Sequence, residues 1–372
     1  MKRRVQLAVF LVLTFMLAVP LINYGFYSWA HDRAYRDFVS PQHDNRVVVL
    51  NSRLLPKYKF DLLGERLPPT PEEFLLVYGN STQFHLRESV FQEYLNCELK
   101  NFYNMSHHSI DYLDAKYFFR EIGESVGKGW TILLGVYPDM FTKTARGAAP
   151  SIDHPWNNLA LWAANIRDGN TSVASMFPRL LNIEWPINPS TWFPFLQQYQ
   201  NTFDLAMVGK PDEYLYRDGS VQFIAADQER RERVAAGIRL DANNFRMIAA
   251  RHLRSPFDPN LLGAFRETVS ALVARGAQVI AYEAELTEYL GGSRWERPEH
   301  TVAYLQMMAE LQQQHSEFAY LNRQQTWVGI PEEWWLDGSH VSFEGGRHIV
   351  ERLSQLIPAG EMCRTGSSGA SG

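Results

Sequence analysis

The residues best suited to catalysis lie near the first and the last of the strands and helices that the sequence predicts. Asp337 and His340 stand three apart in a loop before a short amphipathic segment at 347–357, for which Ser342 is a suitable N-cap. Such a loop can hold the Asp337 carboxylate against one ring nitrogen of His340 and leave the other nitrogen free. The alternative is that Asp337 caps a turn and that His340 is an ordinary surface histidine.

Ser81 supplies the nucleophile that an Asp–His pair lacks. The continuous apolar run 73–78 predicts a strand buried on both faces of a parallel sheet, and Gly79-Asn80-Ser81-Thr82 follows it as a tight turn before a helical pattern. This order lifts Ser81 to the carboxyl edge of the sheet, where open α/β folds bind ligands. In this interpretation His340 is the general base toward Ser81, and Asp337 orients the imidazole. The alternative is that Ser81 only caps the next helix.

The other periodic segments alternate between strand and helix. Strands are predicted at 47–50, 101–106, 130–137, 278–282 and 318–321, and helices at 115–126, 261–274 and 301–314. Alternation of this kind predicts an α/β fold with a mostly parallel sheet and helices on both faces. Asn104 and Asp139 then lie at the same edge as Ser81. The expected oxyanion donors are the backbone amide of Ser81 or Thr82 together with the Asn104 side chain, while Asp139 binds backbone or substrate hydroxyls.

Composition divides the chain into distinct parts. Residues 31–71 are polar, contain several prolines and predict a linker, whereas 72–360 forms the α/β domain. Residues 141–240 break the rhythm with four tryptophans and little periodicity. They predict an insertion over the sheet edge, either a lid or substrate-binding flap or a helical subdomain with a structural role. The low-complexity end, 361–372, predicts a disordered tail.

The N-terminus predicts export. Three basic residues, Lys2 to Arg4, precede an apolar run at 5–22, which as a helix is about 27 Å long and just spans a bilayer. Aromatic residues at 23–29 suit the membrane interface, and the basic flank keeps the N-terminus in the cytoplasm. We therefore expect residues 1–30 to be a single membrane anchor. The alternative is a signal peptide cleaved near Ser28-Trp29-Ala30, and both interpretations export the main domain.

The net charge and the cysteine and histidine content argue against a nucleic-acid-binding protein and against a metal site. A net charge of −5 without a dense Lys/Arg stripe argues against nucleic-acid binding. Cys97 and Cys363 are too few for a zinc site or a disulfide framework, although they can form one bridge in an oxidising compartment. His85, His107 and His108 could gather at the sheet edge, but no carboxylate or cysteine spacing supports a metal there. We therefore expect neither metal nor cofactor.

These motifs resemble the SGNH/GDSL hydrolase superfamily. Gly79-Asn80-Ser81 stands where that family has its Gly-Asp-Ser nucleophile block, and Asp337-Gly338-Ser339-His340 matches its closing D-x-x-H block. Asn104-Met105-Ser106 falls near the second block, without the usual glycine. The stretch 135–139 falls near the third, with Pro138-Asp139 in place of the usual asparagine. The resemblance covers about 72–145 and 240–357.

Within the superfamily the chain looks most like the membrane-anchored, exported branch. That branch includes the D-alanine transfer protein of teichoic acid modification and the alginate and exopolysaccharide O-acetyltransferase proteins. The resemblance implies a three-layer, flavodoxin-like domain in the periplasm, anchored in the inner membrane. It also implies an acyltransferase or esterase that acetylates or deacetylates a cell-surface or exopolysaccharide through a Ser81 acyl-enzyme, with a sugar hydroxyl or water as the acceptor. A membrane-bound O-acyltransferase partner that supplies the acyl group is implied by the same resemblance. The alternatives are a weak or inactive glycan-binding or assembly subunit and, third, a plain lipase or peptidase.

Overall fold

A computed structural model describes most of the predicted α/β domain. Apart from isolated positions near the N-terminus and Arg167, the described residues are 46–49, 55–67, 73–107, 112–142, 213–240, 257–283, 298–322, 329–358 and 362–364. The chain divides into two compact units, Met1–Leu54 with Ser151–Asp212 and Leu55–Pro150 with Glu213–Gly372. In the first, β1 (Arg46–Val49) confirms the strand predicted at 47–50. Every element named below belongs to the second unit.

Five parallel strands form the central sheet. In spatial order they are β3 (Phe102–Asn104), β2 (Phe74–Tyr78), β4 (Trp130–Val136), β7 (Gln278–Glu283) and β8 (Phe318–Leu321). Each neighbouring pair is parallel, which confirms the predicted sheet. β2 and β4 are buried along their whole length, because continuous apolar runs need cover on both faces.

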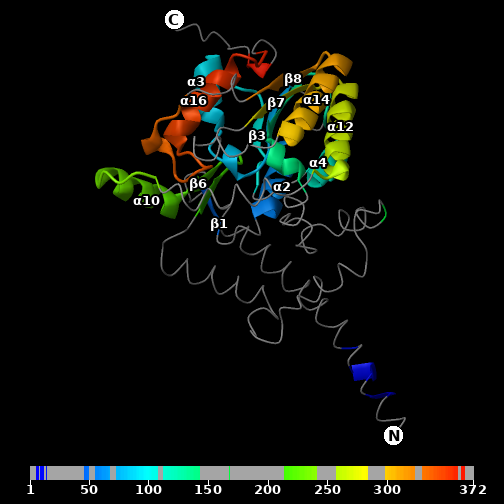
Figure 1. Cartoon of the computed structure of the whole chain (residues 1–372), viewed down its shortest axis with the longest axis horizontal. Coiled ribbons are helices and arrows are strands. Elements are labelled where there is room, and N and C mark those ends of the chain that lie inside the picture. Colours follow the sequence, from blue (N-terminus) through cyan, green and yellow to red (C-terminus); the bar gives the residue numbers. More distant parts are fainter. Residues whose placement is uncertain are drawn as a thin grey trace, which may run out of the picture. The chain divides into compact units, whose positions relative to one another are not determined.

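Helices cover both faces of this sheet (Figure 1). They are α3 (Glu88–Leu95), α4 (Tyr112–Glu121), α12 (Pro259–Ala274), α14 (Pro298–Gln314) and α16 (Phe343–Ser354). A further helix, α2 (Leu55–Arg66), lies beside the edge strand β3, where Arg66 donates to the Phe102 carbonyl. Leu75 and Val77 of β2 join a core cluster with α3 and α16. Tyr78 points to the other face, where it stacks on Phe118 of α4. The alternation follows from the two-residue period of a strand.

Capping residues set the helix ends. Asp258 accepts a hydrogen bond from the Asn260 amide at the start of α12, and Gly276, with φ +88°, follows its end. The Ser342 side chain caps α16 by accepting from the Gly345 amide. This helix therefore begins directly after Ser342, earlier than the predicted segment at 347–357.

A short hairpin and a helix come from the end of the predicted insertion. β5 (Glu213–Tyr216) pairs antiparallel with β6 (Val221–Phe223), and α10 (Ile224–Ala235) follows. The turn needs Gly219, because its φ is +80° and a Cβ there would lie 2.2 Å from the Asn104 carbonyl oxygen. The Val221 amide donates to the Phe84 carbonyl, so this part of the insertion lies beside the turn after β2. Residues 143–212 lie outside the described residues, and the predicted lid role stays a prediction.

The predicted linker contains an ordered helix. Leu62 and Leu63 of α2 are buried, and so is Lys59, whose ammonium donates to the carbonyl oxygens of Asn104 and Ser106. The proline-rich composition of 31–71 concealed this short helical stretch. The interpretation of the whole range as a linker is therefore wrong for residues 55–66.

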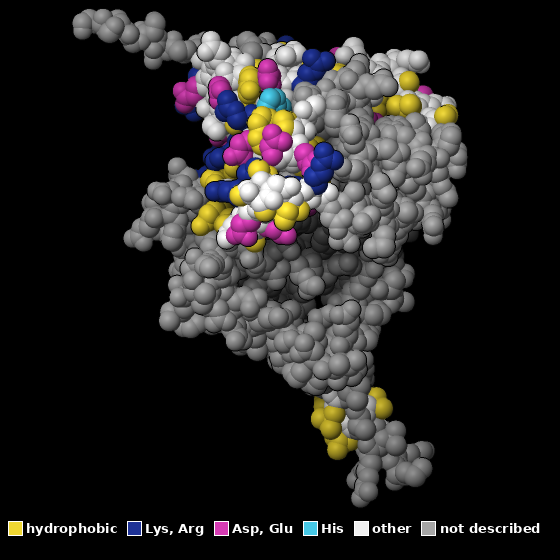
Figure 2. All heavy atoms as spheres, turned by 60° about the vertical axis from the view of Figure 1, so that its left-hand side comes forward, with side chains coloured by type: hydrophobic (Ala, Val, Ile, Leu, Met, Phe, Trp, Pro, Cys, Tyr) yellow, Lys and Arg dark blue, Asp and Glu magenta, His cyan; other side chains and the backbone are white. Residues whose placement is uncertain are grey.

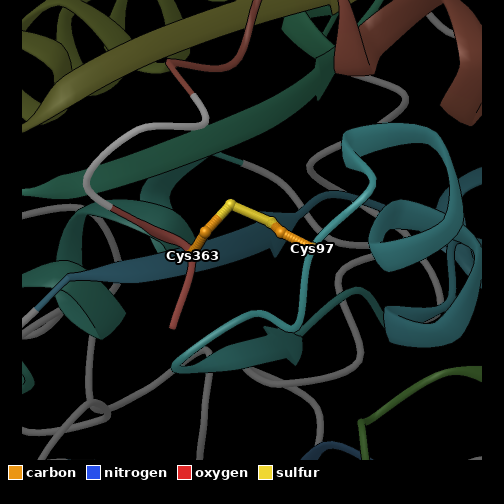
Figure 3. The surroundings of a disulfide bond; sticks show 2 residues. All are labelled: Cys97 and Cys363. Atoms are coloured by element: carbon orange, nitrogen blue, oxygen red, sulfur yellow. A yellow bond between two sulfur atoms is a disulfide. The ribbon is translucent and has the colours of Figure 1, made fainter. Parts of the chain in front are cut away.

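The predicted tail is also ordered in part. Cys363 forms a disulfide with Cys97, which lies just after α3 (Figure 3). Backbone hydrogen bonds join Lys100 to Met362 and Arg364 to Glu98 on either side of the bridge. The prediction of a disordered tail is thus wrong for residues 362–364, because a covalent link and a buried Met362 hold them. Residues 365–372 lie outside the described residues.

The predicted membrane anchor is largely outside what the structure describes. Among the described residues, no helix is both long and apolar enough to cross a bilayer. The described positions within the run at 5–22 are helical.

Candidate active site

The strand order creates a crevice next to β2. When the five strands are numbered by their order in the chain, their order across the sheet is 2-1-3-4-5. This is the strand order of doubly wound flavodoxin-like folds. The chain leaves β2 toward β3 on one side and returns through β4 on the other. The helices that follow β2 and β3 therefore diverge, which opens a crevice at the carboxyl ends of β2 and β4. Ser81 lies in the turn directly after β2.

Three predicted site residues shape the turn that presents Ser81. The Asn80 side-chain oxygen accepts hydrogen bonds from the Thr82 amide at 3.0 Å and the Thr82 hydroxyl at 2.6 Å. A Cβ on Gly79 would lie 2.3 Å from Oε1 of Gln83, so a larger residue there would require the Gln83 side chain to move. These contacts hold the single 3-10 turn η1 (Ser81–Gln83) in place. Gly79, Asn80 and Thr82 therefore act on the conformation of the turn.

A tight loop holds Asp337 and His340 together. It follows η4 (Glu332–Trp334) and closes through a bridge between Trp335 and Val341. Oδ1 of Asp337 accepts the backbone amides of Ser339 at 2.7 Å and His340 at 2.8 Å. Its other oxygen lies 2.7 Å from Nδ1 of His340. The predicted contact between the carboxylate and the imidazole is therefore present, and the same carboxylate also caps the turn.

His340 connects this loop to Ser81. Its Nε2 lies 2.7 Å from the Ser81 hydroxyl oxygen. Burial by itself raises the pKa of Asp337, but the hydrogen bond and charge of His340 and the two backbone amides outweigh it and hold the pKa below its usual range. An ionised carboxylate only accepts hydrogen bonds, so Nδ1 carries the proton and Nε2 is free to accept that of Ser81. Ser81, His340 and Asp337 thus lie in the order that nucleophilic catalysis requires.

Side chains from the insertion support the loop. Arg233 of α10 donates to the Trp335 carbonyl at 2.6 Å, and Arg230 donates to the Glu333 carbonyl at 2.8 Å. Phe223, at the end of β6, packs edge-on against the His340 ring with centroids 5.1 Å apart. Sequence reasoning missed all three residues, because nothing in the irregular segment pointed to the catalytic loop.

The predicted oxyanion donors are only partly available. The Thr82 amide is bonded to Asn80, and both hydrogens of the Asn104 amide donate to the carbonyls of Gln83 and Leu86. Asn104 is fully buried and secures the turn rather than facing the site. Among the described residues, the Ser81 amide has no hydrogen-bond partner and is the donor that remains. The Asp139 side chain lies outside what the structure describes, although its backbone follows β4 in η2 (Pro138–Phe141).

Comparison with protein families and with curated proteins assigns this chain no family. No family model matches it, and a search of curated proteins finds no match. The geometry of the site is therefore the basis for assigning a function.

A small cavity lies beside Ser81, with a volume of about 80 Å³. It is bounded by the end of β6, the start of α10 and the start of α16, and His85 forms part of its wall. The described residues hold no group of three metal-ligating side chains, and His108 lies outside them. His85 and His107 are both buried.

Proposed function

We propose that this chain is an exported, membrane-anchored serine acyltransferase or esterase of the SGNH type. The observation that carries the proposal is the chain of two 2.7 Å contacts from Asp337 through His340 to Ser81. It is assembled from the turn after the first strand of the sheet and the loop before the last helix. The sheet order and the crevice beside β2 agree with the flavodoxin-like, three-layer SGNH domain expected from the motifs.

The reaction divides into two acyl transfers. His340 takes the proton of Ser81 while the Ser81 oxygen bonds to the ester carbonyl carbon of the donor. The Ser81 amide donates to the developing oxyanion, and Asp337 stabilises the imidazolium. Collapse breaks the donor's ester bond, and the leaving alcohol receives the proton from His340. A hydroxyl of the acceptor, or water, then gives its proton to His340 and bonds to the acyl carbon. The ester bond to Ser81 breaks, and His340 returns the proton to the Ser81 oxygen.

Two observations support export. A disulfide between Cys97 and Cys363 is typical of oxidising compartments. In the N-terminal run, the side chains of Leu7, Val9, Phe10 and Leu11 are 52–64% exposed, and the hydrophobic side chains of this segment gather in the lower part of Figure 2. An exposed apolar helix of this kind suits a lipid environment. Anchoring in the inner membrane with the catalytic unit in the periplasm is part of the proposal.

The acceptor and the donor follow from the resemblance to the exported branch. The acceptor is a hydroxyl of a cell-surface polysaccharide or exopolysaccharide, and a membrane-bound O-acyltransferase supplies the acyl group. The second candidate function is a weak or inactive glycan-binding or assembly subunit. One observation favours it: the Ser81 amide is the lone oxyanion donor left among the described residues of the turn.

A serine-directed probe tests the proposal. We expect a fluorophosphonate to label the full chain in detergent and the chain to release acetate from an aryl ester. Both activities should be lost in Ser81→Ala and His340→Ala. Ser270 provides a matched control, because its hydroxyl lies 2.9 Å from Nε2 of His315 and no carboxylate of the described residues bonds that ring. Ser270→Ala should keep both activities. Folded wild type that neither labels nor turns over would favour the binding subunit.

A further inference from the structure

Arg233 of α10 binds the backbone where the catalytic loop begins. Its guanidinium donates to the Trp335 carbonyl at 2.6 Å, and the side chain is 14% exposed. A hydrogen bond from a charged donor is roughly twice as strong as one between neutral groups, and shielding from water strengthens it further. Arg233 therefore holds one defined point of the loop that carries Asp337 and His340.

The bond matters because of the peptide group that it fixes. The Leu336 amide donates to the His340 carbonyl at 2.8 Å, within the bridge between Trp335 and Val341. That amide and the Trp335 carbonyl belong to one planar peptide group, so they point in opposite directions. The amide turns inward to His340, and the carbonyl turns outward to Arg233. Arg233 thus fixes the peptide group that holds the backbone of His340.

The Trp335 carbonyl depends on this guanidinium. The Trp335 side chain is 2% exposed, and its carbonyl accepts no backbone amide among the described residues. If Arg233 is lost, a carbonyl without a partner costs stability, and the peptide group can turn toward water to recover a bond. Turning the group also moves its amide away from the His340 carbonyl. The imidazole then loses its fixed position against the Ser81 hydroxyl, 2.7 Å away.

A carboxylate beside Arg233 fixes the helix that carries it. Oε1 of Glu332 in η4 accepts the Leu240 amide, which lies beyond the end of α10, at 2.8 Å. The same oxygen lies 4.0 Å from the Arg233 guanidinium. Because Glu332 stands just before the catalytic loop, it ties the end of α10 to the loop that Arg233 binds. The guanidinium is therefore held in place before substrate arrives.

The residue before α10 contacts the catalytic histidine directly. The Phe223 ring packs on the His340 ring, with centroids 5.1 Å apart, and on the Phe84 ring, with centroids 5.4 Å apart. Phe84 ends the turn that presents Ser81. The segment that runs from β6 into α10 thus touches both the nucleophile side and the base side of the site.

We propose that Arg233 is a positioning residue for the acyl transfer, which acts through the Trp335–Leu336 peptide to hold His340 against Ser81. It does not line the cavity beside Ser81. Its loss should therefore slow the proton transfer to His340 and leave substrate binding largely unchanged. The inference rests on the proposed function and adds to it the residue that holds the general base.

Turnover and labelling of Arg233→Met test this role, because methionine keeps much of the length of the side chain without a donor. In the full chain in detergent, kcat for an aryl ester should fall about tenfold to a hundredfold, with KM within about twofold of wild type. Fluorophosphonate labelling should reach the same extent at a rate reduced by the same factor. A fraction of unfolded protein would instead lower the extent of labelling and leave its rate unchanged. Arg233→Lys should recover part of the rate, because an ammonium can donate to the same carbonyl.

Arg275 provides the matched control. Its guanidinium donates to the Gly123 carbonyl, so Arg275→Met removes the same kind of bond between the ends of α12 and α4, away from the site. The labelling rate and kcat of this variant should equal those of wild type, even if its thermal midpoint falls. Equal labelling rates in Arg233→Met and Arg275→Met would overturn the inference while leaving the acyl transfer intact.

A proton signal decides the inference without turnover. The Nδ1 proton of His340 lies between the ring and the Asp337 carboxylate, whose oxygen is 2.7 Å from Nδ1. It should give a strongly downfield signal in the proton NMR spectrum of the full chain, which His340→Ala removes. Arg233→Met should broaden or shift this signal, and Arg275→Met should leave it unchanged. An unaltered signal in Arg233→Met would overturn the positioning role, whereas wild type that never labels would remove the proposed function.

Discussion

Nε2 of His340 lies 2.7 Å from the hydroxyl oxygen of Ser81, although 259 positions separate the two residues in the chain. The contact depends on two local structures that form independently. Asn80 and Gly79 shape the turn on one side, and the carboxylate of Asp337 organises the loop on the other. The sheet brings these two structures together, because β2 lies between β3 and β4 and α16 packs on α3, the first α-helix after β2.

Asp337→Asn should reduce turnover of an aryl ester by roughly a hundredfold to ten-thousandfold. The amide preserves much of the loop geometry but no longer stabilises the imidazolium or enforces the tautomer with a proton on Nδ1. Fluorophosphonate labelling should slow in parallel, while circular dichroism and the thermal midpoint change little. Turnover equal to that of wild type would exclude a catalytic role for this carboxylate.

The buried neutral state of His85 makes stability depend on pH. The pKa of His85 is about 3 in the folded protein, against the ordinary value of 6.5. The unfolded chain therefore binds the additional proton between these values, and stability falls as pH decreases through that window. Between about pH 7.5 and about pH 5, wild type should lose about 2 kcal/mol more unfolding free energy than His85→Gln, measured by urea denaturation. Parallel losses in the two proteins would show that His85 is not buried as a neutral group.

The Cys97–Cys363 disulfide should contribute strongly to stability. It closes a loop with a sequence separation of 266 residues, so its loss adds conformational freedom to the unfolded chain. Cys97→Ser with Cys363→Ser should lower the free energy of unfolding by about 2–5 kcal/mol. Urea denaturation with and without reductant measures this effect, and reductant should have no influence on the double variant. A reductant-insensitive wild type would show that the bridge is not formed.

Gly346→Ala tests the close packing of His85 against α16. A Cβ at this position would meet Cδ2 of His85 at 2.5 Å, so the ring must move within the cavity wall. We expect a loss of about 1–3 kcal/mol in stability. Gly263→Ala in α12 is the matched control, because no atom lies within 4 Å of its added Cβ. That variant should be neutral or up to about 1 kcal/mol more stable, since alanine is the better helix former. Equal stability of the two variants would contradict the packing described for His85.

Much of the framework is predictable because local patterns determine it. Buried parallel strands require continuous apolar runs, so the strands ending at Tyr78 and Val136 are evident from the amino-acid pattern alone. The position of Ser81 after the first of them, and of Asp337 and His340 before the last helix, follows from the same alternation of strand and helix. The capping role of Ser342 is also local chemistry.

Packing between distant elements determines which polar groups serve the site. Asn104 follows a strand at the predicted edge, but its amide bonds the Gln83 and Leu86 carbonyls, partners that no local pattern identifies. The bridge from Cys97 to Cys363 likewise depends on where the end of the chain packs.

The amino-acid sequence alone specifies the order of strands and helices and the residues capable of nucleophilic catalysis. Three features arise only in the packed tertiary structure. They are the 2.7 Å contact between Ser81 and His340, the hydrogen bond by which α10 holds the catalytic loop, and the unpaired nitrogen of His85. The physical reason is that secondary structure reflects interactions over a few residues. A hydrogen bond between distant side chains depends on the relative placement of whole elements.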